Sequence, residues 1–258
     1  MKLGIVGDEI SRDFATAVAI GKQAGLHRYE IRNLKSGRVP LCDPAELDEV
    51  DRICTEQDVE ITAISPGLFK LVDDEAGFVQ AMSEVYPLAA EWAHRWRLPG
   101  LIVFGFLKPT MAARVVEWFA KAAQRAATDG LTLMIEPEPI CFVDTLQTAA
   151  SVIEQTGATN LRINYDPGNV AWFESRDPIH EFAIAAPLIS NVHVKDLLAF
   201  KPGTRPEFVP AGEGIINYCT HFAALRDSGY VGPVSLEPHM DGSLETIVRC
   251  KQAVERYI

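Results

Sequence analysis

Short apolar runs and longer segments with helical spacing alternate eight times along this chain of 258 residues. Strands that alternate with helices in this way pair in parallel, because each helix carries the chain back to the same end of the sheet. The apolar runs that we expect to form strands lie at residues 3–7, 28–32, 59–64, 100–106, 131–136, 161–166, 189–194 and 232–237. The pattern therefore predicts an α/β fold with a parallel sheet.

The segments between these runs carry the signals that begin and end helices. Asp43 is placed to cap a helix whose first residue is Pro44, and the segment 12–25 ends in a glycine, as helices often do. The other segments that we expect to be helical lie at residues 76–96, 110–128, 144–156, 177–187, 217–228 and 243–257.

Two folds are built from repeated strand–helix units, the closed barrel and the doubly wound open sheet. Eight units in a chain of this length, without a glycine-rich phosphate-binding turn after the first strand, favour closure. No linker or shift in composition separates one part of the sequence from another. We therefore predict a single (β/α)₈ TIM barrel that occupies residues 1–258 as one domain.

Composition and charge exclude several classes of partner and location. The formal net charge is −11, which argues against nucleic acids and acidic membrane surfaces as partners. The longest strongly apolar stretch, residues 101–107, is too short to span a bilayer, and the first residues lack the pattern of a signal peptide. The five cysteines are scattered and form no CxxC pair, which is typical of reduced thiols. A cytoplasmic protein is expected.

Polar and apolar residues alternate along the last four strands, and the polar set identifies a candidate site. Successive side chains of a strand face opposite sides of the sheet, so the apolar set should face the helices and the polar set the barrel interior. On this assignment the last inward-facing residues of the four strands are Glu136, Asp166, His193 and Glu237. All four should meet at the carboxyl-terminal mouth, where barrel enzymes place their chemistry.

Three carboxylates held this close together cannot all stay ionised without a compensating positive charge. A divalent cation supplies that charge, and three oxygen ligands with one nitrogen suit Mn²⁺, Mg²⁺, Co²⁺ or Zn²⁺. Each residue alone has an ordinary structural explanation, such as an interior ion pair or a helix cap. Their coincidence at one level of one barrel predicts a metal site.

Four motifs in the second half of the chain carry a resemblance to a known family. The motifs are IEPEP at 135–139, INYDPGN at 163–169, NVHVKD at 191–196 with GEG at 212–214, and VSLEPH at 234–239. This set resembles the xylose isomerase-like barrel superfamily, and most of all its sugar phosphate isomerase/epimerase branch. That branch includes ketose 3-epimerases, hydroxypyruvate isomerase and inosose dehydratases.

The resemblance implies a function for the four residues at the mouth. In the family the matching residues bind one divalent metal, commonly Mn²⁺, which assigns Glu136, Asp166, His193 and Glu237 here as ligands. The resemblance also implies that Glu136 and Glu237 act as acid and base. Such a site would isomerise or epimerise a sugar by proton transfer through a metal-bound enediolate. A leaving hydroxyl group beside the same carbon would instead give a dehydratase, and the sequence leaves this choice open.

The sequence departs from the family at two positions, so substrate specificity is not carried over. Asn169 and Glu138 stand where many members of the family have histidine. Residues near the predicted mouth that are candidates to contact the substrate are Lys195, Asp196, Asn169, Glu138, Arg32, Arg205, Lys201 and His239.

The basic residues suggest what kind of substrate the mouth receives. Despite the acidic total, Arg32, Lys35, Arg38, Lys70, Lys108, Lys195, Lys201 and Arg205 all fall at strand ends or in mouth loops. They can be ordinary solvated loop charges, or they can form a rim that attracts a sugar phosphate or sugar acid. The expected partner is thus a small carbohydrate or an anionic sugar derivative, and the oligomeric state stays open, a homo-oligomer included.

Two other classes of function compete with a metal-dependent isomerase. A nuclease built on the same barrel needs several metals and a basic face for DNA, and the six histidines and acidic charge of this chain argue against both. A non-catalytic sugar-binding barrel is the second alternative. It would have no use for a full set of metal ligands with paired glutamates.

Overall fold

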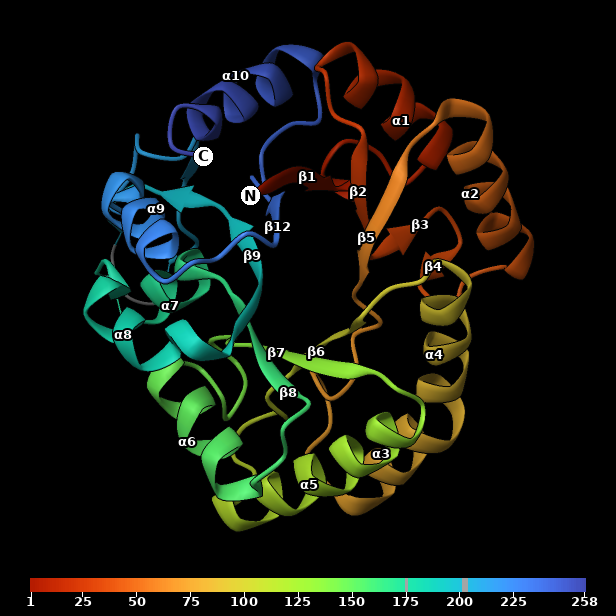
Figure 1. Ribbon diagram of the computed structural model, residues 1–258, viewed down its shortest axis with the longest axis vertical. Coiled ribbons are helices and arrows are strands. Elements are labelled where there is room, and N and C mark those ends of the chain that lie inside the picture. The colour runs from red at the N-terminus through yellow and green to blue at the C-terminus, as the bar shows by residue number, and fades with distance from the viewer. Residues whose placement is uncertain (175, 201–203) are drawn as a thin grey trace.

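A computed structural model describes residues 1–174, 176–200 and 204–258 of the chain. Eight parallel strands form a nearly closed barrel, and helices surround it (Figure 1). The strands are β1 (Lys2–Val6), β2 (Arg28–Ile31), β5 (Glu60–Ile64), β6 (Gly100–Phe104), β7 (Thr132–Glu136), β8 (Leu161–Tyr165), β9 (Ile189–Val194) and β12 (Pro233–Leu236). The predicted (β/α)₈ barrel is confirmed, and every predicted strand is present.

The strands follow one another around the barrel in the order β5-β2-β1-β12-β9-β8-β7-β6. Within the described residues, backbone ladders join each neighbouring pair in this order. The ends of the series, β5 and β6, lie beside each other and bring the sheet round almost to closure. The order places β12, β9, β8 and β7 side by side, so the ends of these four strands share one part of the mouth.

The helices pack outside the strands and begin at residues suited to that position. They are α1 (Phe14–Gln23), α2 (Pro44–Gln57), α3 (Glu75–Gln80), α4 (Tyr86–Arg95), α5 (Ala112–Thr128), α6 (Leu146–Thr156), α7 (Pro167–Glu174), α8 (Phe182–Ala185), α9 (Tyr218–Asp227) and α10 (Leu244–Glu255). As expected, Asp43 caps α2 by accepting a hydrogen bond from the backbone N–H of Ala45. Asp13 and Ser243 cap α1 and α10 in the same way.

Several elements differ from the sequence-based expectation. The helical segment 76–96 contains a π-helical turn at Ala81–Val85 between α3 and α4. The segment 177–187 is a short α8 between two 3₁₀ turns, Pro178–Glu181 and Ala186–Leu188. Helix α7 and two hairpins in the described residues were not expected: the hairpin of β3 (Asn33–Leu34) with β4 (Gly37–Arg38), and the hairpin of β10 (Asp196–Leu197) with β11 (Phe208–Val209). All three lie in mouth loops, where local turn geometry decides the structure.

The barrel interior has an apolar half and a polar half. Ala63, Ile102 and Met134 pack together inside β5, β6 and β7 and form a cluster separate from the large core between sheet and helices. The interior of the other strands is lined by the buried polar residues Glu30, Asn164, Asn191 and Ser235. Burying polar groups is costly unless they bond one another, and Asn191 donates to both Glu30 and Asn164.

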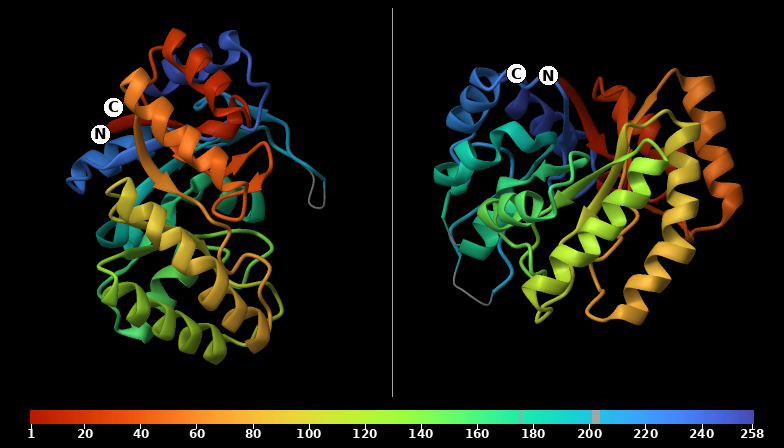
Figure 2. Two further views of the ribbon diagram at one scale, coloured as in Figure 1. Left: turned by 90° about the vertical axis from the view of Figure 1, so that its right-hand side faces the viewer. Right: turned by 60° about the horizontal axis from the view of Figure 1, so that its bottom comes forward.

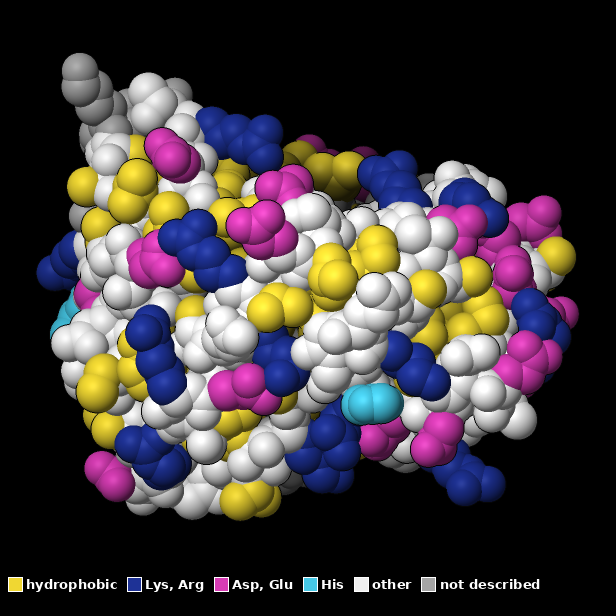
Figure 3. All heavy atoms as spheres, turned by 90° about the horizontal axis from the view of Figure 1, so that it is seen from above, with side chains coloured by type: hydrophobic (Ala, Val, Ile, Leu, Met, Phe, Trp, Pro, Cys, Tyr) yellow, Lys and Arg dark blue, Asp and Glu magenta, His cyan; other side chains and the backbone are white. Residues whose placement is uncertain are grey.

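The two chain ends lie near each other on one side of the barrel (Figure 2). Within the described residues, no helix combines the length and the apolar character needed to cross a membrane. Basic and acidic side chains are intermixed over the face formed around α10 and α1 (Figure 3). The face seen there therefore carries no continuous basic area, in agreement with the net charge of −11.

Candidate metal centre and active site

Four buried side chains from neighbouring strands converge at the mouth of the barrel. Glu136, Asp166, His193 and Glu237 each offer one ligand atom, and these atoms all lie within 4.8 Å of one another. This is the set that strand parity predicted. Their distances are short enough for one small cation to contact all four residues.

The sequence ends three of these strands with a proline directly after the acidic residue. Pro137, Pro167 and Pro238 follow Glu136, Asp166 and Glu237. Because proline has no backbone N–H, it cannot continue the ladder, and the chain leaves the sheet at that point. The carboxylate is thus held at the last position of the strand or just beyond it, facing the mouth.

His193 is oriented by a carboxylate from the opposite side of the barrel. Its Nε2 atom lies 3.0 Å and 2.9 Å from the two carboxylate oxygens of Glu30, which is fully buried on β2. Since an ionised carboxylate can only accept, Nε2 carries the proton, and Nδ1 is the atom turned to the other carboxylates.

Both carboxylate oxygens of Glu136 accept hydrogen bonds from amide side chains. Asn169 Nδ2 lies 2.9 Å from Oε1, and Asn164 Nδ2 lies 2.9 Å from Oε2. Asn164 in turn accepts a bond from Asn191, which continues the polar network into the barrel. Burial raises the pKa of Glu136 to about 7, although His193 nearby acts to lower it.

Glu237 lies between two cationic side chains. Its Oε2 atom is 2.6 Å from Lys195 Nζ, and its Oε1 atom accepts from Arg32. Burial alone would raise the pKa of Glu237, but Lys195 and His193 hold it well below its usual range. Glu136 and Glu237 thus sit in contrasting electrostatic surroundings although both are buried in one site.

The donor set fits a divalent cation. Nδ1 of His193 lies 3.2 Å from Glu237 Oε2 and 3.6 Å from Glu136 Oε2, yet has no hydrogen-bond partner of suitable geometry among the described residues. A nitrogen lone pair facing carboxylates needs a proton or a metal ion between them. Lys195 Nζ also lies 2.6 Å from Asp166 Oδ2, so this ammonium and a cation would compete for the same oxygens.

A second group that could hold a metal shares Glu237 with the first. Glu9, Glu237 and His239 come together there, but Arg32 donates to both glutamates. A guanidinium group already neutralises this position and would repel a second divalent cation. The geometry therefore favours one metal in the described part of the site.

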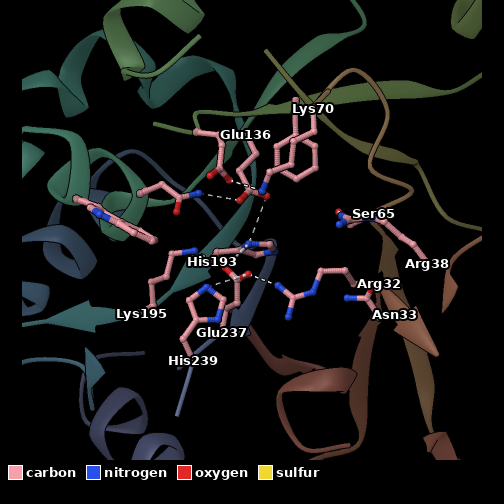
Figure 4. Close-up of a pocket in the computed structure, with 14 residues that line it drawn as sticks. Arg32, Asn33, Arg38, Ser65, Lys70, Glu136, His193, Lys195, Glu237 and His239 are labelled. Atoms are coloured by element: carbon pink, nitrogen blue, oxygen red, sulfur yellow. Dashed lines mark hydrogen bonds and ion pairs between the residues drawn. The ribbon is translucent and has the colours of Figure 1, made fainter. Parts of the chain in front are cut away.

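Three of the four candidate ligands, Glu136, His193 and Glu237, line a cavity of about 350 Å³ (Figure 4). This size suits a small organic molecule. The cavity is lined by Arg32, Asn33, Arg38, Ser65, Lys70, Phe104, Glu136, Glu138, Asn169, Trp172, His193, Lys195, Glu237 and His239. Five of the eight residues proposed as substrate contacts are among them: Arg32, Glu138, Asn169, Lys195 and His239.

Comparison with protein families identifies the fold family. The model of the xylose isomerase-like TIM barrel family matches residues 18–255. The chain belongs to this family. The resemblance inferred from the four motifs is therefore confirmed.

Individual relatives of this barrel include enzymes of more than one reaction class. The chain is 27% identical over 117 residues to a 3-dehydroshikimate dehydratase of Bacillus anthracis, an alignment that covers 40% of the chain and 41% of the relative. It is 31% identical over 144 residues to a putative hydroxypyruvate isomerase of Homo sapiens, covering 51% of the chain and 47% of the relative. The matched part thus spans less than half the length of either curated relative.

A solved structure of the IolI protein with a bound zinc atom has the same fold as this chain. It superposes with a TM-score of 0.82 at 18% identity, covering 100% of this chain and 99% of the other. The curated relatives thus include a dehydratase and a putative isomerase, and one solved barrel of the same fold contains a bound zinc atom.

Two of the proposed substrate contacts do not line the cavity, and a third falls on a residue that the structure does not describe. Arg205 is exposed and is not among the residues that line the cavity, and Lys201 lies outside the described residues. Asp196 is fully buried and turned away from the cavity. Its carboxylate accepts hydrogen bonds from the backbone N–H groups of Leu197, Gly212, Gly214 and Ile216.

Asp196 therefore has a structural role in the segment between β9 and α9. Gly214 makes this possible, because a Cβ atom there would lie 2.3 Å from Asp196 Oδ1. We expect Asp196→Ala to lower the free energy of unfolding by about 2–4 kcal/mol, since two buried and two partly buried backbone donors lose their acceptor. Urea denaturation followed by circular dichroism measures this loss. A stable variant with weakened substrate binding would contradict the structural role.

Other residues of the site were missed by the sequence analysis. Glu30, Asn164 and Asn191 share the inward-facing parity of their strands, and this signal could have placed them below the metal centre. Ser65 directly follows β5 and Phe104 ends β6 at the mouth, but nothing in their residue type distinguishes them from ordinary residues at strand ends. Their place in the cavity depends on how the strands close into a barrel.

Proposed function

We propose that this chain is a divalent-metal-dependent isomerase or epimerase that acts on a small carbohydrate by proton transfer. The observation that carries the proposal is the buried set of three carboxylates around an unpartnered histidine nitrogen, at the mouth of a cavity of about 350 Å³. Glu136, Asp166, His193 and Glu237 would hold the metal. Mn²⁺ is the metal we propose, and Mg²⁺, Co²⁺ or Zn²⁺ suit the same donors.

The metal, when bound, would polarise a substrate carbonyl group and acidify the neighbouring C–H bond. The residues of the chain then have to move the proton. Glu136 and Glu237 are the candidates, because each is buried at the mouth and lines the cavity. They come from β7 and β12, with β8 and β9 between them, so they approach a ligand from different sides. One would remove a proton from carbon, and the other would return one.

Asn169 and Asn164 support this role by holding the Glu136 carboxylate at both of its oxygens. Arg32 supports it on the other side by donating to Glu237. These bonds fix the two carboxylates in place before the substrate enters, which reduces the reorganisation needed for the reaction. Trp172 and Phe104 at the cavity wall would exclude water from it.

A dehydratase acting on a keto sugar or keto-inositol is the second candidate function. The similarity to a 3-dehydroshikimate dehydratase favours it. The same base would remove the proton, and the second glutamate would protonate a departing hydroxyl group rather than a carbon atom. The two candidates differ in whether the product has lost water.

Metal removal and a substrate screen test the proposal together. We expect purified protein to bind one divalent metal per chain, and chelation followed by dialysis to abolish turnover that added Mn²⁺ restores. The screen uses ketoses, keto-inositols and 3-keto sugars with their acids and phosphates, read by NMR in D₂O. Deuterium at the carbon beside the carbonyl group indicates isomerisation or epimerisation, and an unsaturated product indicates dehydration.

Two results would contradict the metal-dependent mechanism. Full activity after complete chelation would exclude a role for the metal. Failure to bind any divalent cation, measured by calorimetry and elemental analysis, would instead favour a sugar-binding barrel without catalysis.

A further inference from the structure

The cavity has a second cationic position opposite the metal centre. Arg38 and Ser65 lie across the cavity from Lys195 and His239 (Figure 4). Arg38 belongs to β4, whose pairing with β3 places it opposite Asn33. The hairpin thus carries the guanidinium group over the end of β5.

Neutral groups hold the Arg38 guanidinium in place. Its Nε donates to the backbone oxygen of Ser65 at 3.0 Å, and its Nη2 donates to the Ser65 hydroxyl at 2.9 Å. Gly67 leaves the necessary room, because a Cβ atom there would lie 2.7 Å from Nε. The guanidinium also lies 5.6 Å from the centre of the Phe104 ring. The position is therefore built by two loops and a strand end.

The other cations that line the cavity are already neutralised. Arg32 pairs with Asp8, Glu9 and Glu237. Lys70 pairs with Glu138 at 2.8 Å, and Lys195 pairs with two carboxylates of the metal centre. Each of these cations therefore has an acidic partner within the protein.

Arg38 differs from them, since no carboxylate of the described residues forms an ion pair with it, and its Nη1 donates to none of them. Burial and the charge of nearby Arg32 lower the pKa of Arg38, although the carboxylates of Glu136, Asp8 and Glu237 act from a distance to raise it. A half-buried charge left unpaired at the wall of a cavity is costly unless a ligand completes the pair.

We propose that Arg38 is the anion-binding residue of this cavity and that the ligand carries a carboxylate group at the end remote from the metal centre. This rests on the proposed function only for the placement of the reacting end of the ligand. A planar guanidinium with free N–H groups matches a carboxylate. Because Lys70 is held by Glu138, Arg38 supplies the one positive charge without an ion-pair partner among the described lining residues, which suits a monoanion better than a phosphate dianion.

The substrate class is therefore a keto or hydroxy sugar acid of small size. The proposed anion site therefore lies at the wall of the cavity rather than on the rim of the mouth, where the sequence analysis placed it. Of the described basic residues that the sequence placed around the mouth, Arg38 is the one at the cavity wall without a carboxylate partner, whereas Arg205 lies exposed outside the lining residues.

Calorimetric binding of three probes of similar carbon framework tests the proposal. The probes are neutral D-fructose, the carboxylate 5-keto-D-gluconate and the phosphate D-fructose 6-phosphate, each measured with and without Mn²⁺. We expect wild-type protein to bind 5-keto-D-gluconate about tenfold more tightly than D-fructose, since a charge-assisted hydrogen bond has this size. Arg38→Gln should remove that preference and change the binding of D-fructose less than about twofold.

Two further variants separate charge from structure. Arg38→Lys keeps the charge and should retain part of the preference for the acid. Arg52→Gln removes an equal charge from the exposed face of α2, where Arg52 pairs with Glu56, and should leave all three affinities unchanged. Thermal unfolding by circular dichroism shows whether each variant is folded.

The outcomes distinguish this proposal from the proposed function. Equal binding of 5-keto-D-gluconate and D-fructose by the wild type would overturn the anion site, as would an equal loss of both in Arg38→Gln. A stronger Arg38-dependent preference for the phosphate would overturn the assignment to a carboxylate. If neutral ketoses exchange hydrogen with solvent in a metal-dependent reaction and the protein shows no preference for anions, the anion site is refuted but the proposed function is not. An Arg38-dependent preference without metal binding would support it and refute the metal mechanism.

Discussion

Replacement of Glu237 by glutamine is expected to reduce turnover by about 10²- to 10⁴-fold, the range typical of losing a general acid or base. The carboxylate accepts from Arg32 at one oxygen and from Lys195 at the other. An amide keeps one of these oxygens and turns an NH₂ group toward a cation at the other. The variant should therefore bind metal more weakly, and it also lacks the carboxylate that would act as acid or base.

Hydrogen isotope exchange separates these two effects. Turnover by the wild type in D₂O should place deuterium at the carbon beside the carbonyl group, and Glu237→Gln should lose this exchange in step with turnover even when saturated with Mn²⁺. Glu213→Gln is the matched control, because Glu213 is exposed and pairs with Arg249 outside the cavity. Product free of deuterium, formed by an enzyme with two metals per chain, would instead indicate a hydride shift.

Replacement of His193 by alanine is expected to have the largest effect on metal binding. The variant loses the one nitrogen ligand of the set and leaves the buried carboxylate of Glu30 without its main partner. Loss of a residue that only hydrogen-bonds to a metal ligand typically lowers metal affinity by roughly 10- to 100-fold. Because His193 is itself a proposed ligand, we expect a larger loss of metal affinity. Leaving Glu30 unpaired should also cost about 3–5 kcal/mol of stability.

A second variant distinguishes a ligand from a structural histidine. Glu30→Gln keeps His193 in place but weakens the bond that orients it, so metal affinity should fall by about 10- to 100-fold while the fold is retained. His27→Ala is the control, because His27 is exposed immediately before β2, at the other end of that strand from the mouth. Calorimetric titration with Mn²⁺ measures all three variants. Unchanged metal affinity in His193→Ala would exclude this residue from the ligands.

Much of the fold and the centre of the site could be predicted from local patterns. Helix caps such as Asp43 depend on neighbouring residues alone, and α2 begins at Pro44 as expected. The convergence of Glu136, Asp166 and Glu237 also follows from a local rule, since strand parity determines which side chains face the interior. Prolines directly after these residues end the strands at the mouth.

The contacts around these residues could not be predicted in the same way. Lys195 and Asp196 are adjacent in sequence, yet one lines the cavity and the other caps a loop that includes Gly212 and Gly214. Residue type does not distinguish the two roles. The distinction depends on the path of a loop between β9 and α9, which is determined by packing and backbone hydrogen bonds distant in sequence.

The sequence by itself determined the barrel, the parity of its strands and the identity of the four residues at the mouth. Periodicity and strand ends are properties of short segments, and a parallel barrel brings equivalent strand ends together without further information. The tertiary structure alone decided which charges are paired. Glu30 reaches His193 across the barrel, Arg32 is surrounded by acids, and Arg38 has no carboxylate partner among the described residues. Such pairing depends on distances between segments far apart in the chain, and residue types along the sequence do not specify those distances.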